Sequence, residues 1–176
     1  MKTLQQHINE KLIINKNSNA KKHNYHPKTK KELNELVNKL IKERGNEADL
    51  NDIDTSEITD MTALFDFSDF NGDISEWDVS NVKDMKYMFA HSKFDGDLSV
   101  WEVSNVENME GMFYDSEFTG KNGDISKWNG SKVNNMKGMF MESKFNEDIS
   151  KWDISKVTDT RFIFDGCQIK QEYKPK

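Results

Sequence analysis

A motif of 24 residues repeats along most of this chain and limits the fold more than any other feature does. The stretch from Gly72 to Asp95 reads GDISEWDVSNVKDMKYMFAHSKFD and recurs with small changes. The tryptophans and the apolar doublets that follow them both step by 24, 27 and 24 residues. These markers are Trp77, Trp101, Trp128 and Trp152, and Met88-Phe89, Met112-Phe113, Met139-Phe140 and Ile163-Phe164. A degenerate copy precedes them, so the sequence holds five copies between about Ala48 and Ile169.

A repeat of this length indicates stacked supersecondary units, because one unit alone cannot bury its apolar face. In the copy quoted above, Trp77 and Val79 flank a polar residue, which is the period of a strand. Ser80 then precedes apolar residues spaced by three and four, as on one face of a short helix. Those residues are Val82, Met85, Met88 and Phe89. We therefore expect each unit to consist of a strand, a turn, a helix and a return loop.

The repeat also resembles a known family. The pattern F-x-x-D-[IL]-S-x-W-[DE]-[VI]-S-x-V-x-x-M-x-x-M-F, as in Phe70 to Phe89, is similar to the BspA-like leucine-rich repeats of bacterial surface proteins and lipoproteins. The segment from Pro27 to Phe65 resembles the way such arrays begin. The resemblance implies a curved β/α solenoid used for protein binding or adhesion, without catalytic residues. The expected fold class is α/β repeat, a leucine-rich-repeat-like solenoid of about five 24-residue strand-turn-helix units with an N-terminal helical cap.

Four segments are expected along the chain. Residues 1–27 should hold a short helix, with Leu4, Ile8 and Leu12 on one face, and a polar linker. Residues 28–46 should form the capping helix, because Thr29 to Glu32 is a capping box and Gly45 can end the helix. Its apolar stripe is Leu33, Leu36, Val37, Leu40 and Ile41. Residues 47–170 should form the solenoid and residues 171–176 a C-terminal tail.

Charge is divided unequally along the chain. Residues 1–45 hold 11 Lys and Arg against 4 Asp and Glu, a net charge of +7, whereas residues 46–170 hold 12 against 26, a net charge of −14. The basic part resembles solvated helix faces, so direct nucleic-acid binding is not expected, and an acidic body favours a protein partner with a basic surface. The sequence shows no secretory signal, lipoprotein cysteine or membrane span, and Cys167 is its one cysteine. We expect a cytoplasmic protein; a surface location would need a longer natural chain.

The candidate binding residues come from two features of the repeat. The polar position of each expected strand would face outward and form a row at about 4.8 Å intervals, where like charges repel. This row is Asp54, Asp78, Glu102, Asn129 and Asp153. It would either bind a basic protein surface or bond locally to the serines two residues on. Three extra residues near Thr119 to Asn122 mark a second candidate, which includes Lys121 and Asn122, because insertions in repeat proteins often map to the binding face.

The other recurring or potentially reactive residues are expected to have structural roles and not catalytic or metal-binding ones. A second acidic column, Asp73, Asp97, Asp124 and Asp148, precedes the expected strands. It lacks the dense ligand spacing of a calcium loop, so we expect it to cap turns. The tryptophans and Met85, Met109 and Met136 are expected in the core. His7, His23, His26, His91 and Cys167 form no catalytic triad or zinc set, so neither an enzyme, a metal nor a cofactor is expected.

Three functions remain from the sequence. The first is a non-catalytic protein-protein interaction module that uses the concave face or the insertion loop of an acidic solenoid. The second is a phage-type inhibitor of a host nucleic-acid-binding defence protein, whose acidic surface mimics phosphates. The third is a fragment of a bacterial surface adhesin. The sequence names neither the partner nor the oligomeric state.

Overall fold

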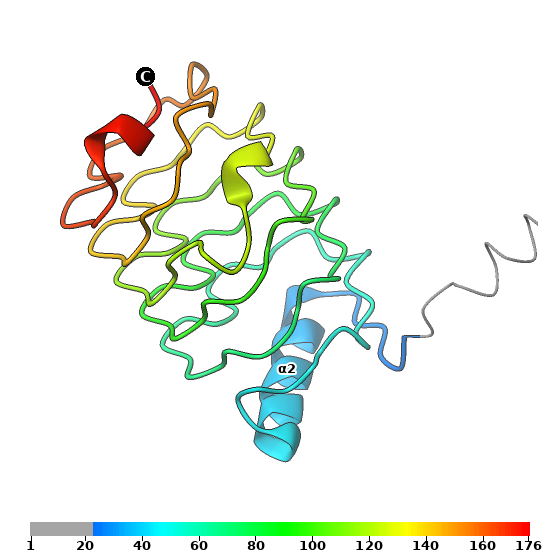
Figure 1. Ribbon diagram of the computed structural model, residues 1–176. Coiled ribbons are helices and arrows are strands. Elements are labelled where there is room, and N and C mark those ends of the chain that lie inside the picture. Colours follow the sequence, from blue (N-terminus) through cyan, green and yellow to red (C-terminus); the bar gives the residue numbers. More distant parts are fainter. Residues whose placement is uncertain (1–22) are drawn as a thin grey trace, which may run out of the picture.

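The computed structural model describes residues 23–176, which form a stack of irregular coils with one α-helix packed at one end (Figure 1). The helix is α2, Lys30–Arg44. Two short 3-10 helices follow, η1 at Ile125–Lys127 and η2 at Gln171–Tyr173. The described residues contain no regular strand; their pairings are isolated parallel bridges. None of the helices within this range combines the length and apolar character that crossing a bilayer needs.

Helix α2 confirms the helix expected from the capping box. The Thr29 side chain accepts a hydrogen bond from the Glu32 amide at 3.2 Å, and the Glu32 carboxylate accepts from the Lys28 amide at 2.7 Å. Gly45 ends the helix with φ 91° and donates to the Ile41 carbonyl. The apolar stripe faces the core, with three of its residues fully buried: Leu33, Val37 and Leu40. The helix lies beside the first copy (Figure 1), and its role as a cap stays a prediction.

The five copies lie side by side through one segment each. We call these the ladder segments: residues 60–68, 84–92, 108–116, 135–143 and 159–167. Their first residues pair in parallel from one copy to the next: Asp60 with Asp84, Asp84 with Asn108, Asn108 with Asn135 and Asn135 with Asp159. Figure 1 shows the same order in space, from the cyan first copy beside α2 to the orange last copy.

Within a ladder segment the amides alternate between two kinds of hydrogen bond. The amides of Met85, Tyr87 and Phe89 donate to carbonyls of the next copy at 2.9–3.0 Å. The Met88 and Ala90 amides, which alternate with these, donate to carbonyls three residues back in their own copy. This second kind of bond closes a tight turn, and Tyr87 at φ 54° is the left-handed residue of one such turn. Each segment is therefore a chain of turns that also pairs with its neighbours.

The expected fold class is wrong. No strand forms at residues 77–79 or at the equivalent positions, and no helix forms over residues 80–89. The chain is therefore not an α/β, leucine-rich-repeat-like solenoid of strand-turn-helix units. The apolar residues at spacings of three and four do point inward, but left-handed residues at Tyr87 and His91 interrupt any helix. Amides that a helix would bond internally reach the next copy instead.

The aromatic core matches its prediction. The tryptophans are 3–9 % exposed, and Met85, Met109 and Met136 are 0–2 % exposed. Each indole N–H donates to a backbone carbonyl of the preceding copy, as Trp101 does to Ile74 at 3.2 Å. The phenylalanines of successive copies stack, with Phe89 and Phe113 at 5.6 Å between ring centroids. These contacts tie each copy to the next through the interior.

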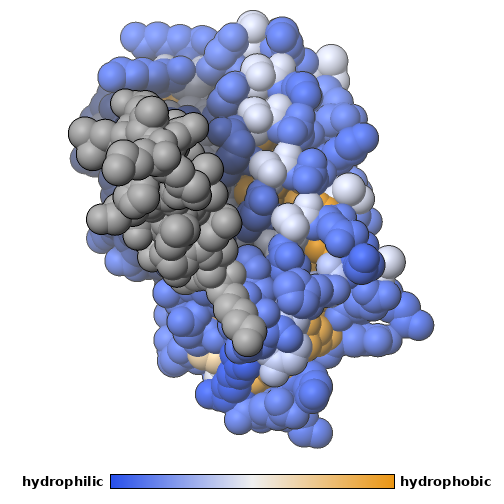
Figure 2. Space-filling view, turned by 90° about the vertical axis from the view of Figure 1, so that its right-hand side faces the viewer, coloured by the Kyte–Doolittle hydropathy of each residue, from blue (hydrophilic) through white to orange (hydrophobic). Residues whose placement is uncertain are grey.

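Some predictions about the chain concern residues outside the described range, and others are not tested by the structure. The short helix expected with Leu4, Ile8 and Leu12 on one face, and the part of the linker before residue 23, lie outside the described residues. The described end of that linker contacts the first copy, because Tyr25 pairs with Ile53. The domain boundaries at residues 27, 46 and 170 stay predictions. Figure 2 shows a face that is mostly hydrophilic, with a column of intermediate hydropathy and small hydrophobic areas.

Candidate functional site

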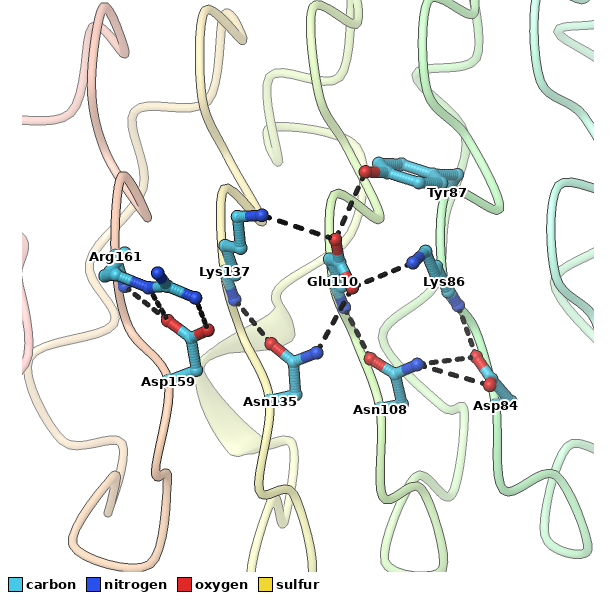
Figure 3. Close-up of polar contacts among 9 residues, drawn as sticks. All are labelled: Asp84, Lys86, Tyr87, Asn108, Glu110, Asn135, Lys137, Asp159 and Arg161. Atoms are coloured by element: carbon cyan, nitrogen blue, oxygen red, sulfur yellow. Dashed lines mark hydrogen bonds and ion pairs between the residues drawn. The ribbon is translucent and has the colours of Figure 1, made fainter.

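The ladder segments carry a row of polar residues across one face of the stack. Each first residue accepts a hydrogen bond from the amide two residues on; for Asp84 the donor is Lys86, at 2.8 Å. The third and fourth copies have asparagine in this row, and the Asn108 amide donates to both oxygens of Asp84 at 3.2 Å. Asparagine separates carboxylates that would otherwise repel one another in adjacent copies. Figure 3 shows this row and the row beside it.

Glu110 is the centre of the second row. Its carboxylate lies 2.9 Å from Lys86 Nζ and 3.9 Å from Lys137 Nζ. It also accepts hydrogen bonds from the Tyr87 hydroxyl at 3.2 Å and the Asn135 amide at 3.3 Å. The two lysines therefore approach it from the copies on either side (Figure 3).

The charge state of this cluster follows from its contacts. Burial opposes the ionisation of Glu110, but the Lys86 ammonium and the neutral donors outweigh it and hold the pKa of Glu110 below its usual range. The same hydrogen bond raises the pKa of Lys86. Burial raises the pKa of the Tyr87 hydroxyl. Glu110 is therefore a charged, fully engaged carboxylate and not a proton donor at neutral pH.

Arg161 and Asp159 end the row as a pair within one copy. Two guanidinium nitrogens of Arg161 lie 2.9 Å and 2.6 Å from the two carboxylate oxygens of Asp159. The guanidinium lowers the pKa of Asp159 to about 2. A positive and a negative group therefore lie side by side at this end of the face.

An open pocket lies beside the charged row. It has a volume of about 270 Å³ and we call it the Phe162 pocket. Its lining residues are Tyr87, Glu110, Gly111, Tyr114, Lys137, Gly138, Met141 and Phe162. Phe162 is 52 % exposed, so part of its ring is open to solvent at the pocket. The pocket therefore offers aromatic and thioether surface directly beside charged groups.

One column of the repeat creates this pocket. The third residue after the polar row is left-handed in all five copies, with φ between 54° and 61°. The residues there are Ala63, Tyr87, Gly111, Gly138 and Phe162. The Tyr87 ring fills the space at Gly111, whereas the space at Gly138, before Phe162, stays open. Sequence reasoning missed this column, although its change in size from Gly to Phe indicates a position that faces solvent.

The predicted row of Asp54, Asp78, Glu102, Asn129 and Asp153 lies in turns, not on a concave sheet, because the described residues form no sheet. Each side chain accepts a hydrogen bond from the amide of the residue two positions on, at 3.0–3.1 Å. Asp54 also accepts from the Ser56 hydroxyl at 2.6 Å, which lowers its pKa to about 2. The local bonding alternative is thus present, while a role in partner binding stays a prediction.

The insertion is held by Asp95. Its carboxylate accepts from the Thr119 amide at 2.7 Å and the Asn122 side chain donates to the Asp95 carbonyl at 2.6 Å. Lys121 is exposed and borders a second open pocket of about 310 Å³, with Asp124 and Asp148. The structure does not bring Lys121 and Asn122 into the Phe162 pocket.

The second acidic column caps turns, as expected. The Ser75, Ser99, Ser126 and Ser150 amides donate to Asp73, Asp97, Asp124 and Asp148 at 2.8–2.9 Å. These bonds from the serines lower the pKa of Asp124 and of Asp148. Over residues 23–176, no three His, Cys, Asp or Glu side chains lie close enough to hold a metal ion.

Comparison with known proteins identifies a family. Residues 31–123 and residues 118–173 match the family described as Mycoplasma protein of unknown function, DUF285. No curated protein and no solved structure matches the chain. The description does not name BspA-like proteins, so that closer resemblance stays a prediction.

Proposed function

Because this chain belongs to DUF285, a family of unknown function, we propose a function from its own surface: it is a non-catalytic protein-binding module. In this proposal an apolar side chain of a partner protein enters the Phe162 pocket. Charged groups of the partner then meet Lys137 and Glu110 at the edge of the pocket. The BspA-like resemblance, whose members bind proteins or adhere to surfaces, points the same way.

The exposure of Phe162 beside an open pocket is the observation that carries the proposal. An exposed apolar patch rimmed by polar residues marks an interaction site, whereas a single exposed apolar residue does not. Tyrosine, phenylalanine and methionine are enriched in the cores of protein interfaces, and a few such residues supply most of the binding energy. Tyr87, Tyr114 and Met141 supply this composition around Phe162.

Charge gives the partner a second property. The coils carry a net charge of −14 over residues 46–170, so a partner with a basic surface would associate faster. Charges at the rim of an interface act mainly on the association rate, whereas a buried anchor acts mainly on dissociation. We therefore assign affinity to the pocket and steering to the surrounding carboxylates.

A non-catalytic role agrees with the state of Glu110, the carboxylate of the pocket. Its low pKa and its bonds to Lys86 and Tyr87 leave it neither protonated nor free to take a proton. A cytoplasmic location, the phage-type inhibitor and the adhesin fragment stay predictions from the sequence.

Filling the pocket tests the proposal. Gly138→Phe places an aromatic ring in the gap, and the equivalent residues Tyr87 and Phe162 already tolerate φ of 54° and 61°. The matched control is Val100→Phe, which enlarges an exposed side chain outside the pocket. A partner is first captured from host lysate and purified, and its affinity for each variant is then measured.

Loss of an anchor of this kind weakens binding by about tenfold or more, which is about 1.4 kcal/mol. We expect this loss for Gly138→Phe and for Phe162→Ala, with the control close to the wild type. Equal affinity of all four proteins for the captured partner would rule out the pocket as the binding site.

A further inference from the structure

The last ladder segment leaves a set of backbone donors without acceptors. In the copy before it, the Met136, Gly138, Phe140 and Glu142 amides donate to carbonyls of the last copy at 2.7–3.0 Å. The equivalent amides of the last copy are those of Thr160, Phe162, Phe164 and Gly166. None of these has a hydrogen-bond acceptor among residues 23–176. We call these four donors the open edge.

The apolar side of the last copy is also less covered than that of the inner copies. Val79, Val82, Met88 and Phe89 in the second copy are 0–1 % exposed. Their equivalents in the last copy are Ile154, Val157, Ile163 and Phe164, all only partly buried. Exposed apolar area next to unpaired donors is what a repeat unit shows on a side that no neighbour covers.

The two ends of the stack differ in this respect. Helix α2 lies beside the first copy (Figure 1), where Met61 and Phe65 are at most 1 % exposed. At the other end of the stack, residues 168–176 contact the last copy on one side only. There Tyr173 accepts from the Ile149 amide at 3.0 Å, and Lys174 Nζ lies 5.4 Å from the Phe164 ring centroid. Neither contact reaches the donors of the open edge.

We propose that the open edge binds an extended segment of a partner protein, which adds to the stack as one further ladder segment. The interfaces between copies show what covers such an edge. At each of them a neighbouring segment offers a carbonyl at every second residue and an apolar doublet such as Met112-Phe113. Strand addition to an exposed edge is a known mode of peptide recognition.

A second copy of this chain does not fit as well. If the last repeats of two molecules met, the amide donors of one would face the amide donors of the other. Its carbonyl-bearing end is the first copy, where α2 packs. Of these two occupants, the open edge favours a segment of another protein. The open edge shares Phe162 with the Phe162 pocket, but it uses the backbone amide of that residue and not its ring, and this inference does not rest on the proposed function.

A peptide taken from the chain itself provides the probe. The peptide of residues 108–116, NMEGMFYDS, carries the carbonyls that accept from the second copy. It is added at millimolar concentration to isotope-labelled protein, and amide exchange is followed by NMR. A peptide of the same composition in scrambled order is the control. The free protein should show at least tenfold faster exchange at Thr160 and Phe164 than at Met136 and Phe140.

Binding should protect alternate amides. We expect slower exchange at Thr160, Phe162, Phe164 and Gly166 with the native peptide and no change with the scrambled one. The absence of any change at these four amides at millimolar peptide would overturn the proposal, as would equal protection by both peptides.

A variant pair gives an independent measurement. Val157→Lys places a charge at the uncovered end, as natural proteins do to block edge pairing. Val100→Lys makes the same change at an exposed site away from it. Val157→Lys should lose the peptide-induced protection while its spectrum remains that of a folded protein, and Val100→Lys should keep it. Unchanged binding by Val157→Lys would contradict docking at this edge.

Discussion

The Tyr87 ring occupies the space above Gly111 in the next copy. A Cβ built on Gly111 would lie 2.1 Å from Tyr87 Cε1, far inside contact distance. One copy further, a Cβ on Gly138 would meet nothing closer than Met141 Cβ at 3.8 Å. Both glycines are left-handed, with φ of 58° and 60°. Gly111 is therefore required by its neighbour, whereas Gly138 leaves a free volume that becomes the Phe162 pocket.

This difference predicts unequal costs for the same substitution. Gly111→Ala and Gly138→Ala each place a side chain in a left-handed conformation, which costs about 1–2 kcal/mol. Gly111→Ala must also displace the Tyr87 ring and its hydrogen bond to Glu110. We expect it to lower the free energy of unfolding by at least about 1 kcal/mol more than Gly138→Ala. Denaturant unfolding of the two variants measures this, and equal losses would contradict the packing of Tyr87 on Gly111.

The capping helix and the core could be predicted from residue types alone. Thr29, Glu32 and Gly45 have roles set by local hydrogen bonding, so their spacing determines the helix ends. Tryptophan recurs at the repeat period, and the interior of the stack is where side chains such as Trp101 can be buried. Local capping and burial are properties that a single sequence records directly.

The conformation of the repeat could not be predicted in the same way. Met85, Met88 and Phe89 face inward in a helix and in a series of tight turns alike, so their spacing does not separate the two. The deciding feature is the positive φ of Tyr87 and His91. Histidine is enriched among residues with positive φ, but tyrosine is not, so the residue types alone do not indicate a series of turns. The Phe162 pocket lies between left-handed residues of neighbouring copies, so its shape could not be predicted without that conformation.

A central tryptophan should carry a large share of the stability. Trp101 is 3 % exposed, lies 6.2 Å from the Phe89 ring centroid and donates to the Ile74 carbonyl. Trp101→Ala should reduce the free energy of unfolding by about 3–5 kcal/mol. Trp101→Phe should lose less, because it keeps most of the apolar volume and gives up the indole hydrogen bond. A loss below about 1 kcal/mol for Trp101→Ala, measured by denaturant unfolding, would remove it from the core.

The charged cluster predicts a salt-independent contribution to stability. Glu110 has a side chain only 14 % exposed, so its bonds to Lys86 and Lys137 are weakly screened. Glu110→Gln should cost about 1–2 kcal/mol, because it weakens charged hydrogen bonds and leaves the lysines without their anion. Glu107→Gln, at an exposed neighbouring position, is the control and should be close to neutral. Thermal unfolding at low salt and at 0.5 M salt measures the difference in melting temperature between the wild type and Glu110→Gln. We expect this difference to persist at 0.5 M salt. Its disappearance there would show that Glu110 makes a solvent-screened surface ion pair.

Acid should destabilise the first copy through Asp54. Its pKa falls from the usual 3.8 to about 2, chiefly because the Ser56 hydroxyl donates to it. A carboxyl with a lowered pKa stabilises the fold above pH 3.8, and this contribution is lost as the pH falls from 3.8 toward 2. Asp54→Asn should therefore flatten the decline of the melting temperature across this window. A decline as steep as that of the wild type would show that other carboxylates, such as Asp159, account for it.

The acidic row allows binding and stability to be separated in one set of variants. Asp78, Glu102 and Asp153 each accept a bond from a serine amide. Replacing all three by alanine removes these acceptors, so the melting temperature should fall. Replacing them by asparagine, glutamine and asparagine keeps an acceptor oxygen and removes only the charge, so the melting temperature should stay near that of the wild type. If the row also meets a basic partner, this second variant should associate more slowly and with a flatter salt dependence. An unchanged association rate in the charge-neutral variant would confine the row to its role in the turns.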